Sequence, residues 1–351
     1  MTGSTLDLVR ESYRAISLYA PDRAPCAIDL SDNTNLWGVP PSADAAIRQV
    51  AQPSITRYPP LYAAELKAAL AAYAGVAPEN VVTGCGSDDV LDSAIRAFAE
   101  PGDAIAYPEP SFAMIPLFAR MNGLEGVAVR LTPELDIDAE GLLATKARVI
   151  YVCSPNNPTG TSTSRPAMEA VIAGTSGIVI LDEAYAEFGN DTWVSEAPSH
   201  GRLLVVRTMS KAFGLAGLRI GYAVGDPAIV AEVEKSRGPY KVSRMGELAA
   251  LAALGNDLDW VRARIADVHE KRDRLRRELM ALGLSSIPSD ANFVLVPVPD
   301  ALAIARRMRT LGVAVRPFSR LAGIGDALRI TIGPWSQMQP ALDALRECLC
   351  S

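Results

Sequence analysis

A single lysine, Lys211, lies in the mostly apolar stretch VVRTMSKAFGLAGLRIGY, residues 205–222. The same stretch supplies two hydroxyls, Thr208 and Ser210, and one guanidinium, Arg219. Such groups can surround a dianionic phosphate, and an amine in a dry pocket can act as a nucleophile. A lone lysine of this kind is more often a surface cation whose stem packs on apolar neighbours. The accompanying hydroxyls and guanidinium favour a binding site.

The stretch TGCGSDD, residues 83–89, joins an apolar run to a predicted helix. It places Gly86, Ser87 and Asp88 where the N–H groups at a helix N-terminus can bind a phosphate. Ser and Asp at such positions more often only cap the helix. The stretch lacks the third glycine of a dinucleotide-binding fingerprint, because position 89 is Asp, which argues against a nicotinamide-dependent dehydrogenase.

Two further stretches, SPNNPTG (154–160) and LDEAY (181–185), also follow apolar runs. The first offers the amide of Asn157 within a rigid turn, and the second delivers Asp182 and then Tyr185. A carboxylate at a strand end caps a helix about as often as it pairs with a buried cation. Together the four stretches predict a ligand with a phosphate, a ring cation and an aldehyde. Pyridoxal phosphate is such a molecule.

The elements that must position these groups alternate between short apolar runs and helical stretches from residue 41 to about 245. Several runs are apolar almost throughout, as in a mainly parallel sheet covered by helices on both faces. We expect an α/β fold with its ligand cleft at the carboxyl ends of the strands. The predicted strands are residues 81–85, 104–108, 126–131, 147–153, 177–182, 203–208 and 219–224.

The pattern after residue 245 predicts a smaller α+β domain. A long amphipathic helix is expected over residues 258–282. It precedes strands at 292–298, 313–317 and 328–333 and helices at 301–311 and up to residue 350. The first 40 residues show few periodic signals. The predicted division is a segment associated with the small domain (1–40), a large cofactor-binding domain (41–245) and a small C-terminal domain (246–351).

Composition and charge exclude several classes of protein. The 351 residues are 49% hydrophobic and 21% charged, as in globular proteins that bury sizeable cores. A net charge of −6 argues against nucleic acid or an anionic membrane as partner. The five cysteines form no CxxC pair and there are two histidines, so we expect reduced thiols, a cytoplasmic location and no metal site. No apolar run approaches the ~18 residues that span a bilayer.

The motifs SPNNPTG, DEAY and SKAFGLAGLRIGY, in this order and spacing, resemble those of the class I and II, fold-type I aminotransferases. Within that family the chain is most similar to the histidinol-phosphate aminotransferase branch, from about Tyr19 to Gly333. The resemblance implies a pyridoxal 5′-phosphate enzyme of amino-acid biosynthesis, with a seven-stranded sheet and a homodimer with shared active sites. Its substrates would be an amino acid, or an amino-alcohol phosphate such as histidinol phosphate, and a 2-oxo acid such as 2-oxoglutarate.

The resemblance also implies roles for individual residues. Lys211 matches the lysine that condenses with the cofactor aldehyde and shuttles protons, and Asp182 matches the acid that keeps the pyridine nitrogen protonated. Asn157 and Tyr185 match residues that bind the ring hydroxyl, and Asn157 also borders the substrate. Phe112 matches the aromatic side chain that stacks on the ring, although a core phenylalanine is the alternative interpretation.

Other matched positions concern the phosphate and the substrate. Tyr58 matches a tyrosine that reaches the phosphate bound by the neighbouring subunit. Arg329 matches the arginine that binds the substrate carboxylate in a fork, while Tyr19 and Arg316 resemble side chains near its distal end. The residues expected around the phosphate of the same subunit are Gly86, Ser87, Asp88, Thr208, Ser210 and Arg219.

Departures from the family pattern concern the substrate. The usual NENP segment is NTNL at residues 33–36, and Phe112 stands where the branch usually has Tyr. The nearest alternative is a threonine-phosphate decarboxylase, which resembles this branch and uses the same cofactor. A non-catalytic binding protein is a further alternative, against which the intact Lys211, Asp182 and Arg329 argue.

Overall fold

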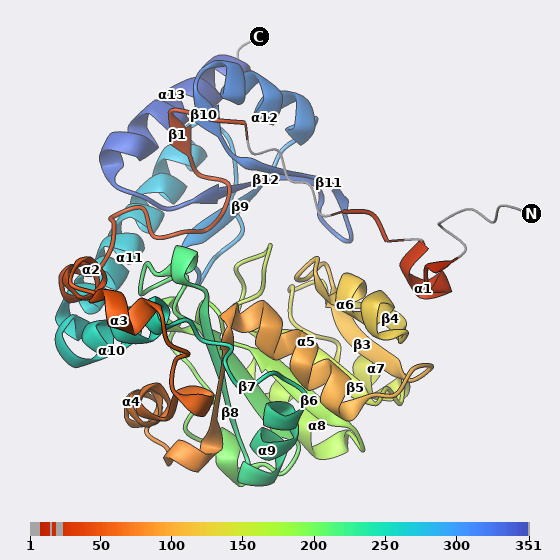
Figure 1. Ribbon diagram of the computed structural model, residues 1–351. Coiled ribbons are helices and arrows are strands. Elements are labelled where there is room, and N and C mark those ends of the chain that lie inside the picture. The colour runs from red at the N-terminus through yellow and green to blue at the C-terminus, as the bar shows by residue number, and fades with distance from the viewer. Residues whose placement is uncertain (1–7, 15, 19–23, 350–351) are drawn as a thin grey trace, which may run out of the picture.

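A seven-stranded sheet forms the centre of the larger part of the molecule (Figure 1). The structure is a computed structural model that describes residues 8–14, 16–18 and 24–349. The strand order is β2-β8-β7-β6-β5-β3-β4; β8 runs antiparallel to β2 and β7, and the other neighbours are parallel. The strands are β2 (Val81–Cys85), β3 (Ala104–Glu109), β4 (Glu125–Arg130), β5 (Val149–Cys153), β6 (Ile178–Asp182), β7 (Leu203–Thr208) and β8 (Ile220–Gly225).

The seven strands agree with the sequence-based prediction to within two residues at each end. Their apolar runs reflect burial on both faces, since every residue of β5, β6, β7 and β8 is buried. At the edge strand β4, exposed and half-buried residues alternate instead. The predicted α/β fold with a mainly parallel sheet is confirmed.

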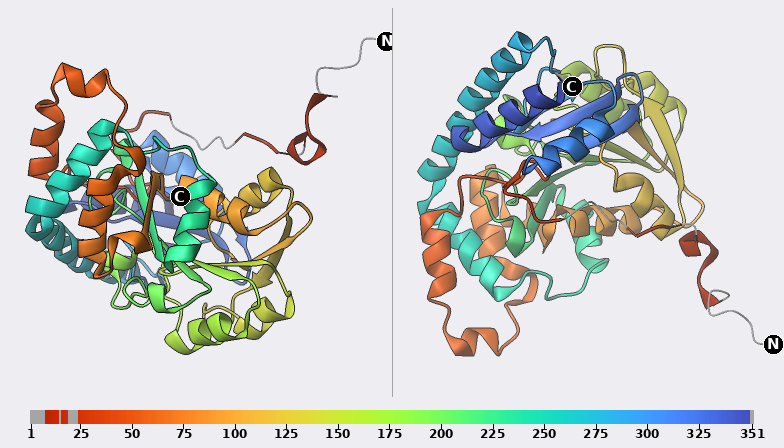
Figure 2. Two further views of the ribbon diagram at one scale, coloured as in Figure 1. Left: turned by 60° about the horizontal axis from the view of Figure 1, so that its bottom comes forward. Right: turned by 90° about the horizontal axis from the view of Figure 1, so that it is seen from above.

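Helices cover both faces of this sheet (Figures 1 and 2). Successive strand residues point to opposite faces, so Tyr151 and Cys153 belong to one core and Ile150 and Val152 to the other. The helices of the Tyr151 face are α5 (Gly86–Phe98), α6 (Ile115–Asn122) and α9 (Pro227–Lys235). Those of the opposite face include α4 (Ala64–Ala74), α7 (Ala139–Ala144) and α8 (Arg165–Gly174).

The smaller part of the molecule contains a three-stranded antiparallel sheet in the order β11-β12-β9. A short parallel pair, β1 with β10, joins the N-terminal segment to this part. The strands are β1 (Ile28–Asp29), β9 (Phe293–Pro297), β10 (Val313–Ala314), β11 (Arg316–Leu321) and β12 (Gly325–Thr331). The helices are α11 (Leu258–Ala281), α12 (Ala301–Thr310) and α13 (Trp335–Leu349).

One strand of the smaller part differs from its prediction. Residues 313–317 were expected to form a single strand, but the chain forms β10 and then a separate β11, which pairs with β12 as a hairpin. The sequence RPFSRL of β11 contains a proline and no β-branched residue, so pairing rather than propensity makes it a strand. The long helix predicted over residues 258–282 is confirmed as α11.

Helix α10 (Arg244–Asn256) packs against α2 (Pro41–Arg48), α3 (Gln52–Ile55) and α4. Asp257, just after α10, accepts hydrogen bonds from the Ser42 and Ala43 N–H groups and so caps α2. Helix α10 runs across residue 245, the predicted boundary between the large and the small domain. The division of the chain at residues 40 and 245 stays a prediction. The remaining short helices are α1 (Glu11–Arg14), η2 (Leu61–Ala63), η3 (Pro78–Asn80), η4 (Ala186–Phe188), η5 (Ala197–Ser199) and η6 (Ala216–Leu218).

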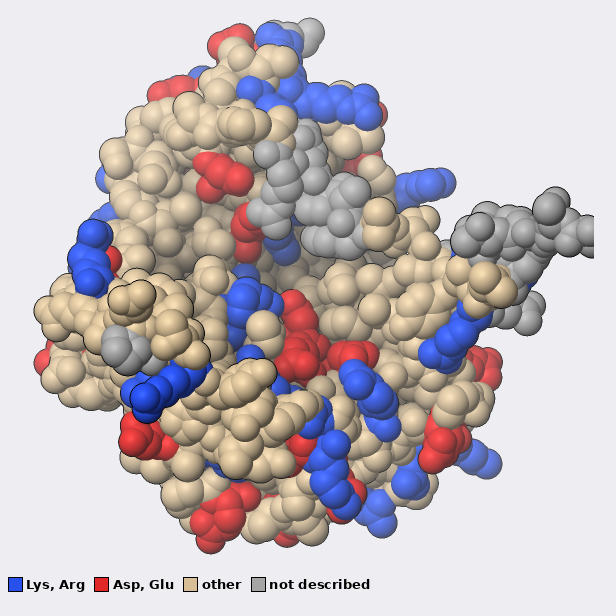
Figure 3. Space-filling model, in the orientation of Figure 1, with Lys and Arg blue, Asp and Glu red and all other residues tan. Residues whose placement is uncertain are grey.

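Two properties of the surface and the helices bear on partners. Figure 3 shows Lys and Arg intermixed with Asp and Glu over the face drawn. No helix in the described part of the chain is both long enough and apolar enough to cross a bilayer.

Candidate active site

A cavity of about 460 Å³ is lined by residues from the carboxyl edge of the large sheet and from the smaller part. The predicted site residues that line it are Ser87, Asp88, Phe112, Asn157, Asp182, Tyr185, Thr208, Ser210, Lys211, Arg219, Arg316 and Arg329. A larger hollow of about 820 Å³, beside Trp193 and His200, contains none of them. We therefore treat the smaller cavity as the candidate site.

Strand direction brings these residues together. Strands β5, β6 and β7 are parallel, so the segments after them, which contain Asn157, Asp182 and Lys211, meet at one edge. Arg219 lies at the same edge because β8, which it precedes, runs in the opposite direction. Gly86 lies beside the cavity with φ of 82°, and a Cβ there would be 2.3 Å from Arg219 Nη2. A side chain at this position would displace the guanidinium.

Lys211 follows β7 and borders the cavity. Its Nζ donates to the main-chain oxygen of Asp32 at 3.3 Å and lies 5.6 Å from the ring centroid of Tyr185. Loss of hydration, and then the positive charge of Arg329, lower the pKa of Lys211 to about 8. About a tenth of this amine is therefore neutral near pH 7, far more than for an ordinary lysine, and a nucleophile or a base requires the neutral form.

Asp182 ends β6 at the floor of the cavity and is 4% exposed. Its Oδ2 accepts a hydrogen bond from the Tyr151 hydroxyl at 2.9 Å, and its Oδ1 accepts one from the Ala184 N–H at 3.0 Å. Burial raises the pKa of Asp182 to about 6, while these two hydrogen bonds and Lys211 oppose the rise. A carboxylate can accept about four hydrogen bonds, so it retains capacity for a donor from the cavity.

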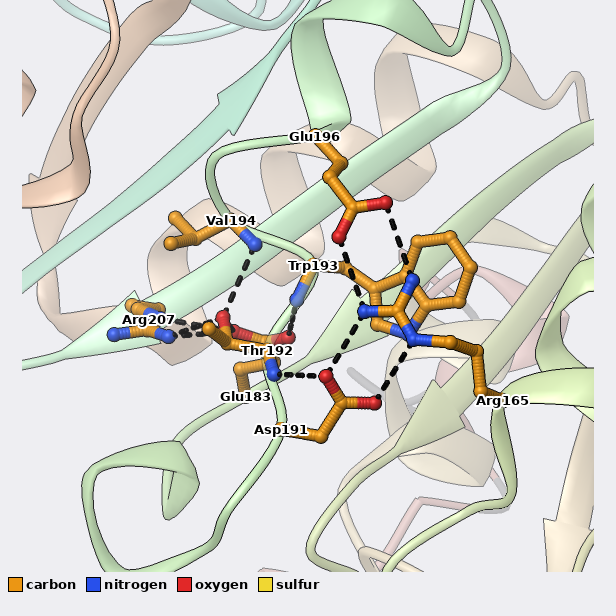
Figure 4. A network of polar contacts seen from close by, with 8 residues as sticks. All are labelled: Arg165, Glu183, Asp191, Thr192, Trp193, Val194, Glu196 and Arg207. Carbon is orange, nitrogen blue, oxygen red and sulfur yellow. Dashed lines mark hydrogen bonds and ion pairs between the residues drawn. The ribbon is translucent and has the colours of Figure 1, made fainter.

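The next residue, Glu183, takes part in a separate polar network (Figure 4). Its carboxylate accepts hydrogen bonds from the Thr192 hydroxyl and the Trp193 N–H, both at 2.7 Å, and from Arg207 at 2.8 Å. Arg165 extends the network by lying over the Trp193 ring at 4.3 Å. These contacts hold the segment after β6 against β7.

Hydroxyl groups gather at one end of the cavity. Thr208 Oγ1 donates to Ser210 Oγ at 2.9 Å and accepts from the Ser210 N–H at 3.1 Å. Ser87 adds a hydroxyl from the first turn of α5, where N–H groups are available to an anion. Arg219 donates to Asp88 at 3.2 Å, and both side chains are nearly half exposed. Such an exposed pair is weak, so Arg219 can turn toward a bound anion.

Arg329, on β12, approaches the cavity from the smaller part. Its Nη1 donates to Asn157 Oδ1 and its Nη2 to the main-chain oxygen of Ser31, both at 2.6 Å. Arg316 lies directly opposite Arg329 in the register of β11 and β12. Two guanidinium groups thus border one side of the cavity, where a carboxylate or phosphate can receive bidentate hydrogen bonds.

The chain matches the family model "Aminotransferase class I and II" over residues 26–345. The chain belongs to this family. It is 34% identical over 349 residues to the histidinol-phosphate aminotransferase of Thermoanaerobacter sp. (strain X514), covering 98% of this chain and 99% of the relative. It is 37% identical over 372 residues to that of Roseiflexus castenholzii (strain DSM 13941 / HLO8), covering 99% and 100%.

A solved structure of histidinol-phosphate aminotransferase from Sinorhizobium meliloti, in complex with pyridoxal-5′-phosphate, has the same fold as this aminotransferase. The TM-score is 0.89 at 27% identity, and the match covers 97% of each chain. The protein is a fold-type I, pyridoxal phosphate-dependent aminotransferase. The family, enzyme class and cofactor predicted from the sequence are confirmed.

The residues of the cavity fit this cofactor. Asp182 is buried, and its hydrogen bonds come from a hydroxyl and an N–H rather than from a cation. A protonated ring nitrogen is the kind of partner that a buried carboxylate needs. The hydroxyls of Thr208 and Ser210 and the start of α5 offer donors to an anion, and Lys211 lines the same cavity, where the charge of Arg329 acts on its amine.

Three predicted residues need separate comment. Phe112 lines the cavity and also packs against the core under α5 and α6, so its position agrees with both interpretations. Tyr58 lies outside this cavity, is 82% exposed and stacks on Tyr240 with ring centroids 4.7 Å apart. Tyr19 lies outside the described residues.

Several cavity residues were not among the predicted site residues, although the segment at residues 33–36 was noted as bearing on the substrate. Asn33 is 1% exposed, donates to the Tyr185 hydroxyl at 3.1 Å and accepts from Thr331 at 3.2 Å, so it connects β12 to the cavity. The polar run DNTN was a signal that could have identified Asn33. Its partners Tyr185 and Thr331 could not be identified in this way, because they are remote in sequence. The missed lining residues are Asp32, Asn33, Thr34, Met114, Cys153, Ala184 and Ala216.

Proposed function

We propose that this aminotransferase exchanges an amino group between histidinol phosphate and 2-oxoglutarate, and so acts in amino-acid biosynthesis. The convergence of Lys211, Asp182 and Arg329 on one cavity carries the proposal. Amino transfer on this cofactor requires three groups: an amine that can form a covalent bond, an acid that pairs with the ring cation, and a guanidinium that binds a substrate anion. The relatives named histidinol-phosphate aminotransferase support the choice of amino donor.

Lys211 and Asp182 have the catalytic roles in this proposal. Pyridoxal phosphate, when bound, supplies an aldehyde that condenses with amines and a ring that accepts electrons from the substrate α-carbon. Lys211 would hold the cofactor through its aldehyde, and its Nζ, when free, would take the proton from the substrate α-carbon. Asp182, ionised above about pH 6, keeps a proton on the ring nitrogen.

The other cavity residues bind and orient. Asn157 and Tyr185 are assigned to the ring hydroxyl, and Phe112 to one face of the ring. The groups assigned to the cofactor phosphate are those at Gly86, Ser87, Asp88, Thr208, Ser210 and Arg219.

Substrate binding is assigned to the arginines of the smaller part. Arg329 is placed to exchange its hydrogen bonds with Asn157 and Ser31 for bonds to an anionic substrate group. Arg316, its neighbour across β11 and β12, is assigned to the distal end of the substrate. The role predicted for Tyr19 at that end stays a prediction.

We further propose a homodimer with shared active sites. Tyr58 and Tyr240 form an exposed stacked pair. A group of exposed apolar side chains from the same helices and loops is typical of a surface that another chain covers. Its members are Ile55, Tyr58, Leu61, Tyr62, Tyr240 and Met245. Tyr58 in this proposal reaches the phosphate bound by the partner, which fits its high exposure and its absence from the lining of its own cavity.

The test is an assay of purified protein with histidinol phosphate and 2-oxoglutarate, in which glutamate is the expected product. A parallel reaction with threonine phosphate measures CO₂ release. Release of CO₂ without glutamate would favour the decarboxylase alternative, which the relatives do not favour. A bound chromophore that reacts with no amino acid would favour a non-catalytic binding protein. The cytoplasmic location stays a prediction.

A further inference from the structure

Tyr151 lies directly beneath the cavity, on the strand next to the one that ends in Asp182. Strands β5 and β6 are parallel neighbours in which Cys153 is paired with Asp182 and Tyr151 with Ile180. Residues two apart in a strand point to the same face, so Tyr151, Cys153 and Asp182 all lie on the face covered by α5 and α6. The Tyr151 side chain therefore lies on the same face of the sheet as the Asp182 carboxylate, within hydrogen-bonding distance of it.

The hydrogen bond between these residues has a defined direction. Burial, and then the negative charge of Asp182, raise the pKa of Tyr151 well above its ordinary value, so the phenol remains protonated. The Tyr151 hydroxyl donates to Asp182 Oδ2 at 2.9 Å, while the Ala184 N–H occupies Oδ1 at 3.0 Å. One donor on each oxygen determines the orientation of the carboxylate plane.

Packing alone does not account for this hydroxyl. Tyr151 is 0% exposed, and its ring packs among apolar core side chains, where phenylalanine would fill nearly the same space. A hydroxyl buried in such surroundings is unfavourable unless it is hydrogen-bonded. Asp182 supplies that bond, and the other charged groups that act on its carboxylate, Asp88 and Lys211, border the cavity from α5 and from the segment after β7.

We infer that Tyr151 is a positioning residue for Asp182: its hydroxyl holds the carboxylate ionised and directed at the ring nitrogen of the cofactor. The inference rests on the proposed role of Asp182. Without the hydroxyl, one carboxylate oxygen loses its donor and the side chain gains rotational freedom. The proton on the ring nitrogen is then held less firmly, although the fold and the cavity walls remain.

The test compares Tyr151→Phe with Tyr222→Phe, a control that removes another buried hydroxyl from the same sheet. Each variant and the wild type are stripped of cofactor and reconstituted with pyridoxal phosphate carrying ¹⁵N in the ring. The ¹⁵N resonance reports whether the ring nitrogen is protonated, a fluorescence titration of the apoenzyme gives the Kd of the cofactor, and thermal unfolding monitors stability.

We expect Tyr151→Phe to move the ¹⁵N resonance toward the unprotonated position and to raise the Kd about tenfold, the effect of losing one hydrogen bond to a charged group. Its kcat should fall while KM changes little. Tyr222→Phe should match the wild type in resonance and Kd. If Tyr151→Phe does not fold, Tyr151→Leu provides a second removal of the hydroxyl.

Two results would overturn the inference. If Tyr151→Phe leaves the ¹⁵N resonance and the Kd at wild-type values, as Tyr222→Phe should, Tyr151 is a packing residue and the proposed function is unaffected. If the wild type binds no pyridoxal phosphate, the inference and the proposed function fail together.

Discussion

Asp182 and Glu183 are adjacent acidic residues at the end of β6, and they are 4% and 2% exposed, yet their surroundings differ completely. Glu183 is paired with the buried guanidinium of Arg207 and accepts two further hydrogen bonds from Thr192 and Trp193 (Figure 4). Asp182 accepts hydrogen bonds from neutral donors and borders the cavity.

The comparison separates two uses of a buried carboxylate. An acid supplied with its own cation holds two segments together, and removal of either partner leaves an uncompensated charge. An acid that lacks a cation remains costly until a ligand provides one, and its raised pKa of about 6 measures that cost. Substitutions of residues that border the cavity should therefore lower catalytic activity, and substitutions in the Glu183 network should lower the free energy of unfolding.

The largest expected effect comes from Lys211→Ala. Amino transfer should fall by about 10⁴-fold, because both the covalent attachment and the proton transfer lose their amine. Borohydride should no longer fix the cofactor to the protein. The matched control is Lys235→Ala, whose side chain is 68% exposed and which should behave like the wild type. Activity within tenfold of the wild type would contradict the assignment.

The opposite side of the comparison is tested by Glu183→Gln. Its free energy of unfolding should fall by about 2 kcal/mol, because Arg207 loses the carboxylate at 2.8 Å and keeps only Glu187, at 3.3 Å, as a buried acidic partner. Urea denaturation measures the loss, and kcat per folded molecule should stay within a few-fold of the wild type. A large drop in kcat at unchanged stability would show that Glu183 belongs to the catalytic groups.

Asp182 predicts an unusual pH dependence of stability in the cofactor-free protein. Its folded pKa of about 6 lies above the ordinary aspartate value of 3.8, so the folded state binds the proton more tightly than the unfolded state. Its contribution is fully present below about pH 4 and is lost as the pH rises through 6, by up to about 3 kcal/mol. Denaturation of the apoenzyme from pH 4 to 7, with Asp182→Asn as control, should show this fall in the wild type alone.

Arg329→Ala should raise the KM for glutamate, the carboxylate-bearing donor of the reverse reaction, by about 10- to 100-fold, through loss of a bidentate ion pair. Arg329→Lys should be intermediate, since lysine keeps the charge but loses the fork. Steady-state kinetics with varied donor measure both variants. An unchanged KM in the alanine variant would remove Arg329 from the substrate site.

The smallest effect is expected from Arg165→Ala. Arg165 bridges Asp191 and Glu196, but its side chain is 35% exposed and theirs are 51% and 45% exposed. Solvent screening limits such pairs, so the free energy of unfolding should fall by about 1 kcal/mol or less. A loss as large as that of Glu183→Gln would mean that the network acts as one cooperative unit.

Much of this arrangement could be predicted before the structure was known. The apolar runs identified all seven strands of the large sheet, because both faces of a parallel sheet are buried and the pattern is local. Polar residues directly after those runs had to meet at one edge, so Asn157, Asp182 and Lys211 could be grouped. Strand β11 was missed because RPFSRL has little strand propensity of its own.

Contacts between remote residues could not be predicted in this way. The bonds from Asn33 to Tyr185 and from Arg329 to Ser31 join positions that are 152 and 298 residues apart. The sequence does not show whether Tyr58 faces its own cavity or the surface, because that depends on how the segment between α3 and α4 folds back. Tyr151 could equally have been an ordinary aromatic residue of the core, because the sequence does not show that its hydroxyl reaches Asp182.

By itself the sequence determined the strand ends and the set of groups that gather there, since burial periodicity and turn chemistry are local properties of the chain. Only the tertiary structure decided that Asp182 borders the cavity while Glu183 is paired with Arg207. Alternation along a strand places neighbours on opposite sides but does not say which side holds the cavity. That choice depends on which helices cover each face, and therefore on packing between segments far apart in the chain.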